Sequence, residues 1–201
     1  MTLEMRNIYK SFGANDVLRN IDFSVSGGEI CALLGENGAG KSTLMNILGG
    51  VLSADSGTIQ LDGKQVTFHN PADSLQAGIA FIHQELNLVN DLAVFENMFI
   101  GRELKRRGGL LDAKTMCERC REVFKRMDVE LDPRTMVRDL DASYKQIVEI
   151  ARALLMDASI IIMDEPTTSL TEPEIQRVFD MMRTVQKQGV AIVFISHKLK
   201  E

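Results

Sequence analysis

A glycine-rich segment with a single lysine is the first place where residue types and spacing indicate a chemistry. It follows the apolar run Ile30–Leu34 and reads Gly35, Glu36, Asn37, Gly38, Ala39, Gly40, Lys41, Ser42, Thr43. This spacing matches the phosphate-binding pattern G-x-x-x-x-G-K-[ST]. Glycines permit a backbone whose successive N–H groups point at one anion, and a helix beginning near Lys41 would direct its positive end at the same anion. We therefore predict that the loop holds a nucleoside triphosphate.

Two side chains of this loop have predicted roles of their own. The ammonium group of Lys41 would bridge the terminal phosphates, and the Ser42 hydroxyl would ligate Mg²⁺. The plainer alternative is a glycine-rich turn with an exposed lysine.

An acidic pair at the end of a second apolar run indicates hydrolysis as well as binding. The run Ser159–Met163, in "SIIIMDEPTTSL", ends in Asp164 and Glu165. Adjacent side chains at the end of a strand diverge, which suits two different tasks. We predict that Asp164 supports Mg²⁺ and that Glu165 polarises an attacking water as general base. A solvated acidic turn is the alternative.

A histidine ends a third run of the same type, Val190–Ser196. Parallel sheets bind ligands at the carboxyl ends of their strands, so His197 is placed to contact the γ-phosphate. Taken alone, it would be a capped surface residue. We assign Lys41, Glu165 and His197 to catalysis, whereas His69 and His83 have no comparable placement and no predicted chemical role.

The elements that must position these residues alternate between strand and helix. The predicted strands are Leu3–Ile8, Ile21–Val25, Glu29–Leu34, Thr58–Leu61, Ile79–Ile82, Ser159–Met163 and Val190–Ser196. The predicted helices are Lys41–Leu48, Ala113–Met127, Tyr144–Met156 and Glu172–Gln188. This alternation favours an α/β fold, and the uninterrupted apolar residues of the last two strands are typical of a parallel sheet buried on both faces. Between about residues 91 and 140 the strand signal disappears, which indicates a helical insertion.

Composition narrows the class of protein. The 201 residues are 45% hydrophobic and 25% charged, which fits one α/β domain with a full core. The net charge of −5 argues against a protein that neutralises nucleic-acid phosphates. The N-terminus lacks signal-peptide architecture, and no apolar stretch approaches the roughly 20 residues that span a bilayer. Three cysteines indicate a reducing compartment. We expect a soluble cytoplasmic protein.

Two of those cysteines, Cys117 and Cys120, form a C-x-x-C within a predicted helix. A zinc site would need further ligands, and Cys31 lies far away in the sequence. We therefore predict buried helical cysteines rather than a metal site.

Taken in order, the phosphate loop, "FIHQEL" with Gln84, the Asp-Glu pair and the strand-end histidine resemble the ATP-binding cassette family of ATPases. The resemblance covers the whole chain. It is closest to bacterial sugar-import cassettes, through "GIAFIHQELNLVNDLAVFENMFIGRE", "QIVEIARAL", "IIMDEPTTSLTEPE" and "VFISHKLKE".

The resemblance implies a fold and a place in a longer chain. The implied fold is an α/β P-loop NTPase core with a mixed or parallel sheet, an N-terminal antiparallel β subdomain and an inserted helical subdomain at roughly residues 88–157. Such polypeptides usually carry two cassettes in tandem. Because residues 1–201 stop directly after a core strand, we expect a cassette truncated at its C-terminus, most of the first of two.

The resemblance also assigns roles that the residues alone do not. Gln84 would complete the Mg²⁺ shell and signal to the membrane subunit, Phe12 would stack on adenine, and residues 169–171 would meet the opposite cassette. The implied ATP-binding residues are Phe12, Gly35, Glu36, Asn37, Gly38, Ala39, Gly40, Lys41, Ser42, Thr43 and Gln84. The implied Mg²⁺ ligands are Ser42, Gln84 and Asp164.

The implied function is ATP hydrolysis that powers import of a small solute, expected to be a simple sugar. The implied partners are a second cassette, transmembrane permease subunits touched by the helical segment, and indirectly a periplasmic or extracellular solute-binding protein, with no nucleic acid. The cassette would be cytoplasmic, peripheral on the inner face of the membrane.

One segment departs from the family pattern. The signature, commonly Leu-Ser-Gly-Gly-Gln, falls on Leu140, Asp141, Ala142, Ser143 and Tyr144, where only the leucine matches. An ionised Asp141 accepts hydrogen bonds but donates none, and it would repel a γ-phosphate on the opposite cassette. The alternative function is therefore a cassette that binds nucleotide with little or no hydrolysis. A rearranged signature that still closes is the other possibility.

Two rival classes fit the sequence poorly. A DNA-repair or chromosome ATPase would need long coiled-coil insertions, whereas about 100 residues without heptads separate the phosphate loop from the signature. A ribosome-acting cassette would need basic surface and arms, which this acidic chain lacks.

Overall fold

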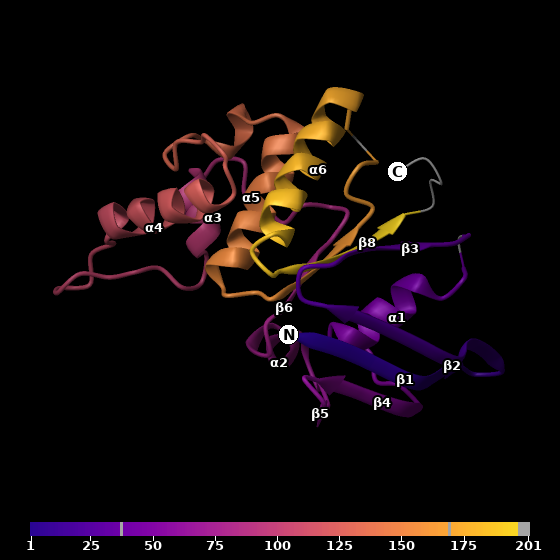
Figure 1. Ribbon diagram of the computed structural model, residues 1–201. Coiled ribbons are helices and arrows are strands. Elements are labelled where there is room, and N and C mark those ends of the chain that lie inside the picture. The colour runs from indigo at the N-terminus through magenta and orange to yellow at the C-terminus, as the bar shows by residue number, and fades with distance from the viewer. Residues whose placement is uncertain (37, 169, 197–201) are drawn as a thin grey trace. The chain divides into compact units, whose positions relative to one another are not determined.

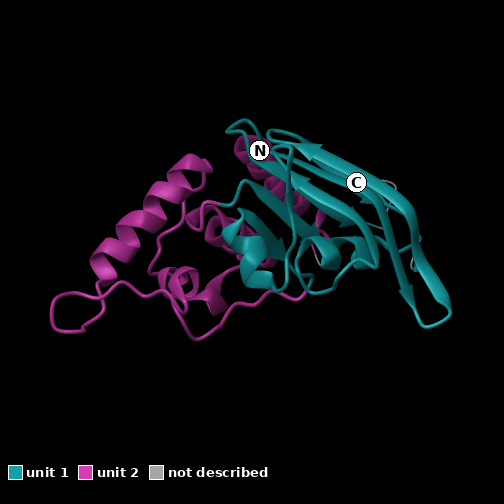
Figure 2. Ribbon diagram, turned by 90° about the horizontal axis from the view of Figure 1, so that it is seen from below, with its two compact units in different colours: residues 1–84, 158–166, 186–201 teal, residues 85–157, 167–185 magenta. Residues whose placement is uncertain are grey.

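A computed structural model describes residues 1–36, 38–168 and 170–196 (Figure 1). The predicted site residues Asn37 and His197, and also Ser169, lie outside the described residues. The chain divides into two compact units, shown in Figure 2: unit 1 comprises residues 1–84, 158–166 and 186–201, and unit 2 comprises residues 85–157 and 167–185.

Unit 1 contains an antiparallel sheet that begins at the N-terminus. Its strands, in the order β2-β1-β4-β5, are β1 (Thr2–Phe12), β2 (Asn15–Ser26), β4 (Ser56–Leu61) and β5 (Lys64–Val66). A two-residue turn joins β1 to β2, and its first residue, Gly13, has the positive φ of 62° that such hairpins require. The antiparallel β subdomain implied by the resemblance is therefore confirmed.

The second sheet of unit 1 is parallel. Its strands, in the order β3-β8-β7-β6, are β3 (Ile30–Leu34), β6 (Ile79–Ile82), β7 (Ile160–Asp164) and β8 (Ala191–Ser196). All residues of β8, and all of β7 except Asp164, are buried. The prediction from their uninterrupted apolar runs is confirmed, because these two central strands are covered on both faces.

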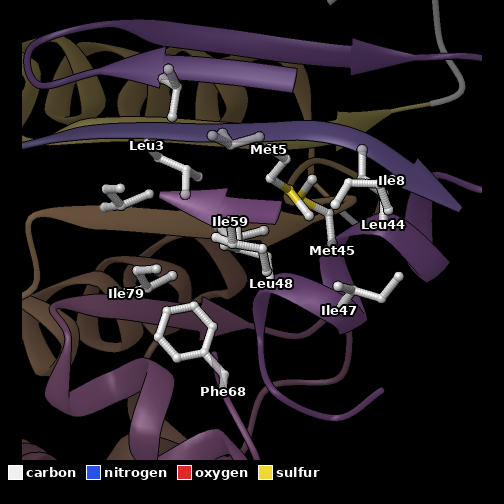
Figure 3. Packing of buried hydrophobic residues seen from close by; sticks show 14 of the residues in the cluster. Leu3, Met5, Ile8, Leu44, Met45, Ile47, Leu48, Ile59, Phe68 and Ile79 are labelled. Carbon is white, nitrogen blue, oxygen red and sulfur yellow. The ribbon is translucent and has the colours of Figure 1, made fainter. Parts of the chain in front are cut away.

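Helix α1 (Lys41–Leu48) packs into the core that the two sheets share, whereas the short helix α2 (Pro71–Gln76) lies beside β6. Figure 3 shows side chains of β1, such as Met5 and Ile8, meeting Leu44 and Met45 of α1. Apolar residues of the parallel sheet belong to the same cluster. The helix that follows the glycine-rich loop is therefore anchored in the centre of unit 1.

Unit 2 is helical. Its elements are α3 (Val94–Phe99), α4 (Ala113–Arg126), a 3-10 turn (Val137–Asp139), α5 (Ala142–Leu155) and α6 (Glu172–Gln186), whose last residue belongs to unit 1. Aspartate side chains cap two of these helices: Asp112 accepts from the Thr115 N–H, and Asp141 accepts from the Tyr144 N–H. Helices α3, α4 and α5 pack against one another.

The C-x-x-C pair is part of this helical packing. Cys117 and Cys120 lie on α4 and are both buried, as predicted. Burial, reinforced by the neighbouring Cys117, raises the pKa of Cys120 to about 12. This thiol therefore stays protonated at neutral pH, where it packs as a small apolar group.

Among the described residues, the sequence located the four longest helices and every strand except β5. Helices α1, α4, α5 and α6 lie within two residues of their predicted bounds, whereas α2, α3 and β5 were not predicted. The helical subdomain predicted at roughly residues 88–157 stays a prediction. Within residues 1–36, 38–168 and 170–196, no helix has the length and apolar character needed to cross a membrane.

Truncation of a core side chain in β1 should destabilise the fold. Leu3 has no exposed surface, so Leu3→Ala should lower the free energy of unfolding by about 2–5 kcal/mol. Leu110, which is 75% exposed, supplies the matched control, and Leu110→Ala should change stability by less than about 0.5 kcal/mol. Urea denaturation followed by circular dichroism measures both. Equal stabilities of the two variants would contradict the position of Leu3 in the core.

Candidate phosphate-binding site

The glycine-rich loop connects β3 to α1, and one of its glycines is required for two reasons. Gly40, directly before α1, has a φ of 88°, in the left-handed region that suits glycine. A Cβ atom at this position would lie 2.7 Å from Leu18 Cδ2 and 3.1 Å from the Val17 carbonyl oxygen. Strand β2 therefore approaches the loop so closely that a side chain at residue 40 would have to displace Leu18 and press against the Val17 carbonyl group.

The lysine that begins α1 is held above this loop. Its Nζ donates to the carbonyl oxygens of Gly35 at 2.6 Å and Glu36 at 2.9 Å. No side chain caps the helix at Gly40. Because the first N–H groups of an α-helix lack intrahelical acceptors, those of α1 are suited to an external anion.

Parallel strand pairing brings the acidic pair to the same edge of the sheet. Leu34 at the end of β3 pairs with Ser196 of β8, and Asp164 at the end of β7 pairs with Ile195. A pocket of about 390 Å³ opens at this edge. It is lined by Asn15, Val17, Gly38, Ala39, Gly40, Lys41, Ser42, Thr43, Asp164, Glu165 and Ile195. Eight residues predicted from the sequence therefore line one pocket.

The two carboxyl groups of this pocket differ in environment. Burial, and then the negative charge of Glu165, raise the pKa of Asp164 above its usual value, while His83 and Lys41 oppose that shift. Glu165 has a φ of 46°, which is uncommon for a residue other than glycine, and its N–H donates to Ile195 O at 3.0 Å. Strained backbone of this kind is often found at functional sites.

The oxygen atoms of the pocket suit Mg²⁺, which needs few protein ligands, better than they suit a metal ion whose ligands all come from the protein. The described part of the chain contains no cluster of three or more His, Cys, Asp or Glu side chains that could hold a metal. Mg²⁺ usually takes only one or two protein oxygens and fills its shell with phosphate and water. The Ser42 hydroxyl and the Asp164 carboxylate supply such oxygens, and a cation would offset the adjacent charges of Asp164 and Glu165.

Four other predicted residues lie outside the lining of this pocket. Phe12, at the end of β1, is 48% exposed, and Gln84 is exposed two residues after β6. Gly35 and Glu36 supply the carbonyl groups that hold Lys41. The roles predicted for all four stay predictions.

The strand end that carries Phe12 is fastened by Asp55. This carboxylate accepts from Lys10 Nζ at 2.6 Å and from both the N–H and the hydroxyl of Ser11. The hydrogen bonds from Lys10 and Ser11 lower the pKa of Asp55 to about 2. Lys10 Nζ also lies 5.5 Å from the centroid of the Phe12 ring. The exposed ring is therefore presented beside a fixed positive charge.

Sequence reasoning missed three residues near the site. Asn15 and Val17 of β2 line the pocket, and His83 opposes the rise in the pKa of Asp164. No motif marks the first two, since they reach the loop only through the pairing of β2 with β1. His83 stands one residue beyond β6, and that position at the carboxyl end of a parallel strand was the available signal.

A parallel sheet, a glycine-rich loop and a following helix in this arrangement define the class of P-loop nucleotide-binding proteins. The protein-family model described as ABC transporter matches residues 18–168. The chain therefore belongs to the ABC transporter family, and the resemblance to ATP-binding cassettes is confirmed.

Curated relatives share about half of the sequence. The chain is 48% identical over all 201 residues to the ribose import ATP-binding protein RbsA of Bacillus licheniformis. It is 49% identical over the same length to the ribose import ATP-binding protein RbsA of Oceanobacillus iheyensis. The chain spans 41% and 40% of these two relatives.

Solved structures agree on the fold. The ADP conformation of MJ1267, an ATP-binding cassette of an ABC transporter, has a TM-score of 0.86 and 27% identity, covering 99% of this chain and 82% of that one. A nucleotide-free ATP-binding cassette has a TM-score of 0.84 and 26% identity, covering 100% and 83%. The predicted P-loop NTPase fold is confirmed.

Removal of the loop lysine should weaken nucleotide binding. Lys41→Ala deletes a charge-assisted contact with phosphate, which should cost roughly 1.5–3 kcal/mol of binding free energy. Calorimetry with Mg-ATP measures the loss, and Lys114→Ala is the control because its side chain is 77% exposed on α4. If Lys41→Ala bound Mg-ATP with unchanged affinity, the assignment of this loop to the nucleotide-binding site would be wrong.

Proposed function

We propose that the chain is an ATP-binding and hydrolysing cassette that powers the import of a small solute, a simple sugar, through membrane permease subunits. The observation that carries the proposal is the single pocket in which loop residues Gly38–Thr43 meet Asp164 and Glu165. It places groups suited to holding phosphate beside groups suited to activating water.

Binding follows from the loop and from α1. The loop amides and the positive end of α1 attract the phosphate oxygens, and Lys41 adds a full positive charge. A bound phosphate replaces the two hydrogen bonds that Lys41 makes to loop carbonyls, so their loss offsets part of the gain. The exposed ring of Phe12 offers a face on which adenine stacks.

Ser42, Asp164 and Gln84 are the residues that would hold Mg²⁺. When bound, the cation supplies neutralisation of the charge on the β- and γ-phosphate oxygens. The pairing of Asp164 with Glu165 supports this assignment: burial, and then the adjacent negative charge, raise the pKa of Asp164, and a positive ion would relieve the repulsion between the two carboxyl groups.

Hydrolysis needs a base beside the γ-phosphate. Glu165 orients a water molecule and takes its proton while the water oxygen attacks the γ-phosphorus. The bond from that phosphorus to the bridging oxygen breaks, which leaves ADP and inorganic phosphate. His197 contacts the γ-phosphate in this proposal.

The partners are a second cassette, from the same longer polypeptide or a second copy, and permease subunits at the inner face of the membrane. Segment 169–171 meets the opposite cassette, and the helical segment before Leu140 meets the permease. A solute-binding protein takes part only indirectly. The names of the relatives as ribose import proteins support the transport role.

Transport is tested with the complete protein and its permease subunits in vesicles. Addition of ATP and a loaded solute-binding protein should produce uptake of radiolabelled ribose, which unlabelled ribose abolishes. Uptake without ATP, or hydrolysis that no sugar stimulates, would contradict the proposed coupling. If a different sugar, but not unlabelled ribose, abolished the uptake, the transport function would stand and the solute would be that other sugar.

Replacement of the proposed base should separate binding from turnover. Glu165→Gln preserves size and hydrogen bonding but removes the charge, so turnover in the complete protein should fall by about 10² to 10⁴ while Mg-ATP affinity is retained. Glu118→Gln on α4, where the side chain is 52% exposed, should leave both unchanged. Hydrolysis by Glu165→Gln at the wild-type rate would reassign Glu165 to a structural role.

A further inference from the structure

An arginine of α6 is bonded to the first residues of α5. Asp141 caps α5, and its Oδ1 accepts from the Tyr144 N–H and the Ser143 hydroxyl, each at 2.8 Å. Arg177 NH1 donates to Asp141 Oδ2 at 3.0 Å and to Ser143 Oγ at 2.6 Å. The Arg177 guanidinium also lies 4.9 Å from the centroid of the Tyr144 ring. Three of the four substituted signature residues therefore contact one side chain.

This contact changes the electrostatic interpretation of Asp141. Burial raises its pKa, but hydrogen bonds from Tyr144, Ser143 and Arg177 outweigh burial and leave the pKa below its usual value. The carboxyl group is therefore ionised at neutral pH, with a guanidinium positive charge 3.0 Å away. The Asp141–Arg177 pair therefore has no net charge. The interpretation from the sequence alone had treated Asp141 as a negative charge without a partner.

Arg177 differs from another arginine of α6 in how firmly its charge is held. Arg183, on the same helix, pairs with Asp180 at 3.2 Å, and both side chains are largely exposed. Arg177 instead combines an ion pair, a bond to the buried Ser143 and stacking on Tyr144, so several partners restrict its position. A restrained guanidinium holds its charge beside Asp141 more constantly than a free side chain does.

We propose that Arg177 is a positioning residue that cancels the charge of Asp141, so that the start of α5 accepts the terminal phosphate of a nucleotide bound on a second cassette. This inference rests on the proposed function, because it requires two cassettes to enclose ATP. It adds that the acidic signature holds nucleotide as long as Arg177 is present, and that Asp141 and Arg177 act as a pair.

Nucleotide retention in the complete protein, with its second cassette, tests the inference. Glu165→Gln serves as the reference, since it slows hydrolysis in the first site, and a radiolabelled non-hydrolysable ATP analogue is used with Mg²⁺ so that neither site can turn it over. The bound analogue is then chased with unlabelled ATP. The reference should retain two nucleotides. Adding Arg177→Ala should speed dissociation of one of them about tenfold, because the uncompensated Asp141 carboxylate then repels phosphate. The effect should shrink at high salt, which screens charges.

Three further variants in the same background separate charge compensation from packing. Arg177→Lys keeps the charge and should retain both nucleotides. The double change Arg177→Ala with Asp141→Ser removes both charges and should restore slow dissociation. Arg183→Ala is the matched control and should behave as the reference.

Four outcomes would overturn the inference. They are normal retention in Arg177→Ala, a defect that Asp141→Ser does not repair, a defect insensitive to salt, and a reference that holds only one nucleotide. Failure of the proposed function looks different: the reference would then retain no nucleotide, and Lys41→Ala would not change binding.

Discussion

The site in unit 1 depends on the parallel pairing of β3, β8 and β7. Parallel strands in register end at one edge, so residues distant in the sequence meet there: the loop after Leu34, Ser196 and the pair that begins at Asp164. A shift of one residue in β7 would turn its side chains to the opposite faces and displace both carboxyl groups. Because β7 and β8 are buried on both faces, no alternation of apolar and polar residues fixes that register, and the shapes of the packed side chains must do so.

A second constraint acts on the loop itself. The pattern of glycines predicted a phosphate-binding loop, and the positive φ values of Gly38 and Gly40 agree with that interpretation. The pattern did not reveal that β2 lies against one side of the loop, where a Cβ atom at residue 40 would crowd Leu18 and Val17. That contact joins the antiparallel sheet to the loop, and no local sequence pattern indicates it.

The sequence predicted what local patterns determine. Helices of two turns or more show an apolar periodicity that remains recognisable when one residue departs from it. The central strands are uniformly apolar. Helix α3 and strand β5 are too short to show a period, although α2 had a readable start in the Asn70 cap followed by Pro71. Phe12 and Gln84 were assigned by resemblance alone, and their assignments remain predictions.

The acidic residues show why charge cannot be interpreted from the sequence alone. Asp164 and Glu165 are neighbours in the chain, so their repulsion was predictable, and together with burial, which contributes more, it raises the pKa of Asp164 in this pocket. Asp141 looked equally repulsive, but its partner lies on another helix, 36 positions along the chain. One acidic site therefore keeps an excess of negative charge, whereas the other is neutralised by Arg177. In the proposed function, the same residue type attracts Mg²⁺ at the first position, whereas at the second position its paired charge no longer repels a phosphate.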